Sequence, residues 1–168
     1  MRDAAPTSHM VGAALLIVGM VIFVTWPQAL VMTTSMAGHD DPMFSIWRLA
    51  WFAHAVRDAP RHLLDANIFY PANRTFAFAD TTLLEATITA PFLWAKVSPI
   101  LVYNVLLLGG IAASGLAMFV LARHLVGATG PALVAAAIFT MAPCRIEPFM
   151  RLELQGAMWI PLTFYALQ

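Results

Sequence analysis

The sequence has few charged residues and almost no cysteine. Only 11% of its 168 residues are charged, whereas 61% are hydrophobic; a typical soluble domain is about one quarter charged. A soluble chain of this length cannot hide so much apolar surface, because small domains keep a large share of their residues next to water. The single cysteine, Cys144, excludes an internal disulfide framework. Nine basic and nine acidic residues cancel, so no nucleic-acid partner is expected.

Long stretches of the chain carry no charge at all. No Asp, Glu, Lys or Arg lies between Asp3 and Asp40, in 100–122 or in 125–144. By contrast, six of the nine acidic residues lie in 32–97. This distribution predicts an all-α membrane protein whose apolar transmembrane helices flank a long external first loop that contains amphipathic juxtamembrane helices.

The apolar stretches also predict where the chain crosses a membrane. About 20 apolar residues cross a hydrocarbon core of about 30 Å. We therefore predict spans over 10–32, 100–122 and 126–143, and an incomplete span over 156–168. The incomplete last span indicates the N-terminal part of a longer protein. The first span is predicted to stay as an anchor, because the nearest small-residue cleavage motif lies well beyond its densest apolar run.

The segment 81–97 leaves two topologies open. It has the length of a short span, but it contains Glu85, Pro91 and Lys96. If it spans the membrane, Arg123 is external and 145–151 is cytoplasmic. If it lies on the outer surface as an amphipathic or re-entrant helix, Arg123 is cytoplasmic and 145–155 shares a side with the loop. The second arrangement follows the positive-inside tendency better, and it predicts a multi-pass protein of the cytoplasmic membrane with a cytoplasmic N-terminus.

The loop 33–80 is too long and too polar for an idle connector, and its many aromatic residues argue against disorder. Asp41 followed by Pro42 predicts a helix over 42–56, with the aspartate as its N-cap. On that helix, Asp41, Ser45 and Arg48 share a face. Asp80, with Thr81 and Thr82, is expected to cap the next helix, which covers 81–97.

Metal ligation has weak support in the sequence. The candidate ligands His39, Asp40, His54 and His62 lack the tight spacing of a strong metal motif. No cofactor is predicted, and a need for a divalent metal stays open.

Two further features lie outside the loop. The cluster 145–155 contains Arg145 and Arg151, and it is either an ordinary connection or an anion-binding site suited to a lipid phosphate. The small residues Gly109, Gly110 and Ser114 either provide a close helix–helix contact or reflect the usual composition of membrane helices.

Several short motifs together carry a family resemblance. They are Gly38-His39-Asp40-Asp41-Pro42 with Trp47-Arg48 and His54; Asn67-Ile68-Phe69-Tyr70-Pro71 with Phe78-Ala79-Asp80; Pro143-Cys144-Arg145; and Leu152-Glu153-Leu154-Gln155 with Trp159-Ile160-Pro161. In this order they resemble bacterial membrane glycosyltransferases of the GT-C fold, over nearly the whole chain. The chain departs from that pattern at Cys144, where relatives tend to have an aromatic residue, and it is much shorter than such enzymes.

The resemblance implies a function at the cell envelope. Such enzymes transfer a sugar from a polyprenyl-phosphate donor to an acceptor on the external face of the membrane. The catalytic aspartate would be Asp41, with Asp40 as the alternative, and Arg145 or Arg151 would hold the donor phosphate. The other implied substrate-binding residues are Arg48, His54, Tyr70, Asp80 and Gln155. The expected partners are the lipid bilayer and a polyprenyl-phosphate-linked sugar. Two alternatives remain: a non-catalytic transport or assembly component, and an inactive truncated product.

Overall fold

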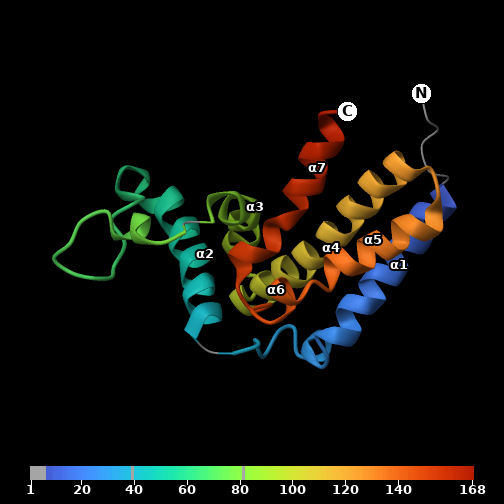
Figure 1. The fold of residues 1–168 in the computed structure, drawn as a ribbon. Helices are drawn as coiled ribbons and strands as arrows, with labels where there is room; N and C mark the ends of the chain where they lie inside the picture. The colour runs from blue at the N-terminus through green and yellow to red at the C-terminus, as the bar shows by residue number, and fades with distance from the viewer. Residues whose placement is uncertain (1–6, 39, 81) are drawn as a thin grey trace. The chain divides into compact units, whose positions relative to one another are not determined.

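The computed structural model describes residues 7–38, 40–80 and 82–168, and all regular structure in these ranges is helical (Figure 1). The prediction of an all-α fold is therefore confirmed. The chain divides into two compact units. We call Met32–Leu106 the insertion unit, and Met1–Val31 together with Leu107–Gln168 the helical unit.

The helical unit is built around three helices that pack side by side (Figure 1). Its elements are α1 (Thr7–Val24), η1 (Gln28–Leu30), the greater part of α4 (Pro99–Val126), α5 (Thr129–Thr140), α6 (Pro143–Ile146), η4 (Leu152–Met158) and α7 (Trp159–Ala166). Its core is formed by Ala13 and Ile17 of α1, Phe119 and Ala122 of α4, and Ala132 and Ala136 of α5. Four of these six residues are alanine, and such small side chains let helix backbones approach closely.

Helix α1 ends earlier than the predicted span over 10–32. Its last residue is Val24, and the backbone N–H and hydroxyl of Thr25 both donate to the Val21 carbonyl, at 3.0 and 2.7 Å. Pro27 follows two residues later; it has no N–H to continue the helical ladder, and it disfavours helical geometry in the residue before it. Residues 28–30 then form only a short 3-10 turn.

Helix α4 extends the predicted span over 100–122 at both ends. It has 28 residues, or about 42 Å at 1.5 Å per residue. Among the helices in the described ranges, it alone is long and apolar enough to cross a membrane. Helices α5 and α7 have 12 and 8 residues and are shorter than the predicted spans over 126–143 and 156–168. Pro143 follows the end of α5, and 156–158 belongs to η4.

The small residues of α4 have different surroundings. A side chain on Gly110 would meet the Gln155 carbonyl at 3.0 Å, and the Ser114 hydroxyl donates to the same oxygen at 3.2 Å. These two residues therefore allow η4 of the same chain to approach α4 closely. Gly109 has open space beside it. Association of separate chains through this surface stays a prediction.

The insertion unit consists of two packed helices joined by an irregular segment. Its elements are α2 (Asp40–Asp58), η2 (Pro60–His62), η3 (Thr75–Phe78), α3 (Leu83–Trp94) and the first residues of α4. Helix α2 packs against α3, and the Trp94 indole donates to the Ala53 carbonyl at 2.8 Å. Within 40–80, the loop forms a helix, two 3-10 turns and a connecting segment that is tied by hydrogen bonds.

The start of α2 lies two residues before the predicted one. Because the helix begins at Asp40, Asp41 lies in the first turn and the prediction that it is the N-cap is wrong. Proline is tolerated in a first turn, where its missing N–H has no helical acceptor, so Pro42 does not prevent the earlier start.

The cap of α3 agrees with the prediction in part. Its N-cap is Thr82, one of the three residues expected there, but Thr82 has φ 45° and makes no side-chain capping hydrogen bond. Asp80 is not the N-cap. The neighbouring Thr81 lies outside the described residues.

Candidate functional site

A buried arginine organises the polar side of α2. Arg48 is 3% exposed; its Nη2 donates to Ser45 Oγ at 2.9 Å, and its Nη1 donates to the Asp80 carbonyl. The guanidinium also lies over the Phe44 ring, 5.0 Å from the ring centroid. The Ser45–Arg48 contact confirms that these two residues share a face of α2, as predicted; the place of Asp41 on that face stays a prediction. The hydrogen bond from Arg48 to Asp80 also links α2 to the segment just before α3.

Two of the predicted substrate-binding residues, Arg48 and Asp80, are thus brought together, but through the backbone oxygen of Asp80. The side chain of Asp80 is exposed. Two guanidinium nitrogens of Arg48 already have acceptors within the protein, so its contacts give it a positioning role in the insertion unit.

The two predicted catalytic acids lie together in the first turn of α2. Asp40 is exposed and Asp41 is half-buried. They precede Ser45 by about one turn, and Pro42, which follows them, is buried. An acidic group with partial access to solvent is suited to receive a proton from an acceptor hydroxyl.

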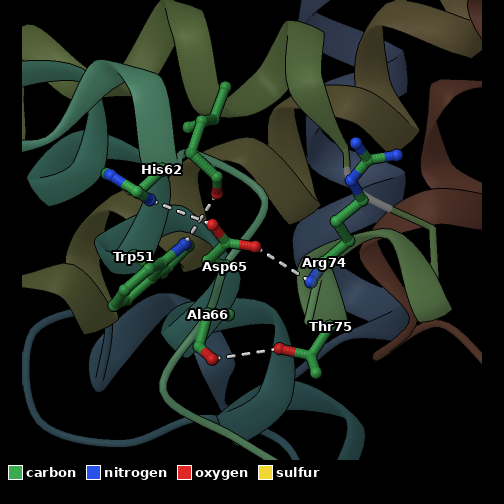
Figure 2. Close-up of polar contacts among 7 residues, drawn as sticks. Trp51, His62, Asp65, Ala66, Arg74 and Thr75 are labelled. Atoms are coloured by element: carbon green, nitrogen blue, oxygen red, sulfur yellow. Dashed lines mark hydrogen bonds and ion pairs between the residues drawn. The ribbon is translucent and has the colours of Figure 1, made fainter. Parts of the chain in front are cut away.

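A hydrogen-bonded bracket around Asp65 holds the irregular segment in shape (Figure 2). One Asp65 oxygen accepts from the Arg74 amide at 3.0 Å, and the other pairs with His62 Nδ1 at 3.1 Å. The Thr75 hydroxyl donates to the Ala66 carbonyl at 3.0 Å. The hydrogen bond from His62, followed by that from the Arg74 amide, lowers the pKa of Asp65 below its ordinary value.

Tryptophan side chains of α2 attach the same segment to the helix. Trp51 Nε1 donates to the Leu63 carbonyl at 3.0 Å (Figure 2), and Trp47 Nε1 donates to Asn67 Oδ1 at 3.2 Å. The Trp47 ring also packs edge-on against Phe76, with ring centroids 6.2 Å apart. The asparagine of the Asn67–Pro71 motif therefore fixes the loop to α2. The sequence pattern indicated neither the hydrogen bonds of the tryptophans nor the bracket around Asp65.

The tip of the segment presents aromatic side chains to its surroundings. Tyr70 is 97% exposed, and the neighbouring Phe69 stacks on Phe78 with ring centroids 6.2 Å apart. Phe69 has φ 59°, a left-handed conformation that is uncommon for a bulky residue. Tyr70 is therefore accessible, as a substrate-binding residue must be, but no described contact joins it to Asp41.

His54 does not belong to the acidic end of α2. Its Nδ1 pairs with Asp58 Oδ2 at 2.8 Å, and both side chains are more than half exposed. Thirteen positions separate His54 from Asp41, which corresponds to about 20 Å along the helix axis. The structure therefore separates these two predicted site residues. Within the described ranges, no group of three or more His, Cys, Asp or Glu residues could hold a metal ion; His39 lies outside those ranges.

The second polar cluster lies in the helical unit and is largely internal. Arg145 is 7% exposed; its Nη1 donates to the Phe139 carbonyl at 3.2 Å and its Nη2 to Gln155 Oε1 at 3.1 Å. The Gln155 amide in turn donates to the carbonyls of Phe149 and Arg145, at 3.3 and 3.4 Å. Arg145 and Gln155 are thus brought together, as neighbours in one buried network.

The partners of Arg145 are a carbonyl, an amide and an aromatic ring, so none of them carries a full negative charge. Burial lowers the pKa of the guanidinium below its ordinary value. Its Nε is buried and has no hydrogen-bond acceptor among the described residues. Arg151 differs, because its side chain is exposed. The sequence indicates one polar cluster over 145–155. It does not indicate that Ser114 and Gly110 of α4 lie against the backbone of Gln155.

The two polar clusters belong to different compact units, one in Met32–Leu106 and the other in Leu107–Gln168. No protein-family model, curated protein sequence or solved structure matches the chain. The resemblance to GT-C glycosyltransferases therefore stays a prediction from the motifs.

Proposed function

We propose that this chain is a membrane-embedded, glycosyltransferase-like protein whose insertion unit acts on a lipid-linked sugar at the membrane surface. The observation that carries the proposal is the attachment of the segment before α2 to the start of α4. Asn104 is fully buried, and its Nδ2 donates to the carbonyls of Met32 and Ser35, at 2.8 and 2.9 Å. The segment that leads into Asp40 is thereby tied to the first turns of the helix that is long enough to span.

This attachment limits how far the acids can lie from the membrane boundary. Six residue steps separate Ser35 from Asp41, so their Cα atoms are at most about 21 Å apart. Asn104 lies five residues after Pro99, about 8 Å along α4. Because α4 exceeds a hydrocarbon core of about 30 Å, its first turns would lie at the headgroup level. The phosphate of a polyprenyl donor would lie at the same level.

The proposed chemistry needs one base at this place. The Asp41 carboxylate accepts the proton of the acceptor hydroxyl while that oxygen attacks the anomeric carbon. The bond from the anomeric carbon to the phosphate oxygen breaks, and polyprenyl phosphate leaves with the electron pair. Asp40, one position earlier, is the alternative base. The donor-phosphate role of Arg145 and Arg151 rests on the resemblance alone, and the internal contacts of Arg145 favour a structural role for it.

The test is transfer of radiolabelled sugar from polyprenyl-phosphate sugars to membrane-bound acceptors, with the chain reconstituted in vesicles. Asp41→Asn should reduce transfer by about 100- to 10,000-fold. Asp58→Asn, at the other end of α2, is the matched control and should retain activity. Both variants should keep the melting profile of the native protein. Loss of activity in both variants, or in neither, would contradict the assignment of Asp41.

A non-catalytic binding or assembly role is the second candidate, and one observation favours it. Arg48, Asp80, Arg145 and Gln155, four of the predicted binding residues, take part in contacts inside the protein. Under this alternative the native chain transfers no sugar from any donor, and Asp41→Asn binds polyprenyl phosphate as tightly as the native protein does.

A further inference from the structure

Helix α3 has one face that no part of its own unit covers. Leu84, Ile88 and Phe92 follow one another at four-residue spacing and are 47%, 54% and 54% exposed, so they form a single stripe along the helix. The other face is closed, because Ala86 and Ala90 are buried in the unit that contains α2. The exposed stripe contains no charged residue.

Helix α3 is too short to bury this stripe as a transmembrane span. Its 12 residues make a helix of about 18 Å, and a hydrocarbon core is about 30 Å thick. Helix α3 is therefore too short to cross a bilayer by itself.

The connection to α4 fixes where α3 can lie. Only four residues, 95–98, separate Trp94 from Pro99, so the two Cα atoms are at most about 18 Å apart. Helix α4 is about 42 Å long and exceeds the hydrocarbon thickness, which places Pro99 in the headgroup region if α4 spans. The end of α3 then lies within about 18 Å of that boundary.

The corner between the two helices has a defined geometry. Val97 N–H donates to the Phe92 carbonyl and Lys96 N–H donates to the Leu93 carbonyl, both at 3.0 Å. With Lys96 at φ 62°, these bonds form a Schellman motif, in which the left-handed position is usually glycine. Here it is a lysine with an exposed side chain. A long cationic side chain at a membrane boundary extends toward lipid phosphates while its methylene groups contact apolar surface.

We infer that α3 is an interfacial helix that binds the surface of an anionic phospholipid bilayer. Leu84, Ile88 and Phe92 lie in the outer acyl region, and Lys96 lies at the level of the lipid phosphates. Trp94, which is 41% exposed, is a residue type enriched at that level. The inference rests on the proposed membrane location of α4, and it names the partner of a surface to which the proposed function gives no role.

Depth measurements on nitroxide-labelled protein test this inference. Single cysteines replace Leu84, Ile88 or Phe92 in a Cys144→Ser background, and the full chain is reconstituted in vesicles of phosphatidylcholine and phosphatidylglycerol. Gly109→Cys is the deep reference, because it lies in α4 beside open space. His54→Cys on the exposed side of α2 is the aqueous reference.

The expected result is one shallow depth for all three α3 labels, between the two references, with access to oxygen and protection from a water-soluble relaxation agent. A steady change of about 12 Å from 84 to 92 would mean that α3 inserts steeply, which overturns the inference. Labels in water while the Gly109 label is in lipid would also overturn it but leave the membrane location intact. A Gly109 label in water would refute the membrane location itself. Dipolar coupling between α3 labels of two chains would show a second copy on the stripe instead of lipid.

Discussion

Two glycines of α4 provide a sharp test of how the helical unit is packed. A Cβ on Gly115 would overlap Thr140 Oγ1 and would lie 3.0 Å from Ile17 Cγ2. Thr140 and Ile17 are both fully buried. The Thr140 hydroxyl donates to the Ala136 carbonyl at 2.7 Å, so it cannot rotate away without losing that bond. Gly109, on the same helix, has nothing within 4 Å of the position where its Cβ would be.

The magnitudes follow from these surroundings. Adding a methyl group to a well-packed core costs about 1–3 kcal/mol, and loss of the threonine hydrogen bond adds about 1 kcal/mol. Alanine gains up to about 1 kcal/mol over glycine inside a helix, and this gain applies at both sites. Gly115→Ala should therefore lower the free energy of unfolding by about 1–3 kcal/mol, while Gly109→Ala should leave it unchanged or raise it slightly.

Equilibrium unfolding of the purified chain in mixed micelles, followed by tryptophan fluorescence, measures both variants. The double variant Gly115→Ala with Thr140→Ala is the decisive control, because removal of the hydroxyl makes room for the added methyl group. It should be more stable than Gly115→Ala alone. If Gly115→Ala and Gly109→Ala unfold at the same denaturant concentration, the close packing of α4 against α5 and α1 is wrong.

Three further predictions concern the insertion unit. The pKa of Asp65 is lowered, mainly by the hydrogen bond from His62. The ionised carboxylate therefore stabilises the fold fully above the pKa of unfolded aspartate, about 4, and this stabilisation is lost as the pH falls through the pKa of Asp65 in the folded protein. Hydrogen exchange protection of the Arg74 amide should decrease in that acid range, and in Asp65→Asn this dependence should disappear. Arg48→Lys cannot bond to both Ser45 and Asp80 through a planar fork, so it should destabilise the unit by about 1–2 kcal/mol. Faster proteolysis within 60–80 would measure this loss, and unchanged cleavage would contradict the positioning role. Lys96→Gly should relieve a left-handed backbone cost of about 1 kcal/mol and should therefore raise Tm in neutral micelles. Because it removes the cationic side chain, it should also weaken binding to phosphatidylglycerol vesicles. A fall in Tm would contradict the geometry of the corner between α3 and α4.

Local features of the sequence were predicted well. The Asp41-Pro42 signal located α2 to within two residues, and the three-residue spacing of Ser45 and Arg48 predicted that they share a face, on which they are in contact. Both depend only on helix geometry over a few residues. The central part of α4 was predicted for the same reason, since an uncharged apolar run of that length has few alternatives to a helix.

The longer-range contacts could not be read from the sequence. Asn104 bonds to backbone atoms about 70 positions earlier, at Met32 and Ser35, and no periodicity points to such partners. The Asp65 bracket likewise joins residues across an irregular turn, where spacing carries no information on distance. Helix ends were missed where a proline effect outweighed apolar composition, as at the end of α1.

Arginine was the residue type whose role the sequence could least decide. The sequence suggested ligand-binding roles for Arg48, Arg145 and Arg151. Two of them turned out to be buried and to donate to backbone carbonyls near helix ends: Arg48 to Asp80 before α3, and Arg145 to Phe139 in the last turn of α5. Carbonyls in a last turn lack helical donors, and a guanidinium supplies several N–H groups at once. The few cations in this chain therefore have a structural use, because they donate hydrogen bonds to backbone carbonyls that apolar side chains cannot satisfy. Such a role leaves the acids at the start of α2 as the first residues to substitute in a search for activity.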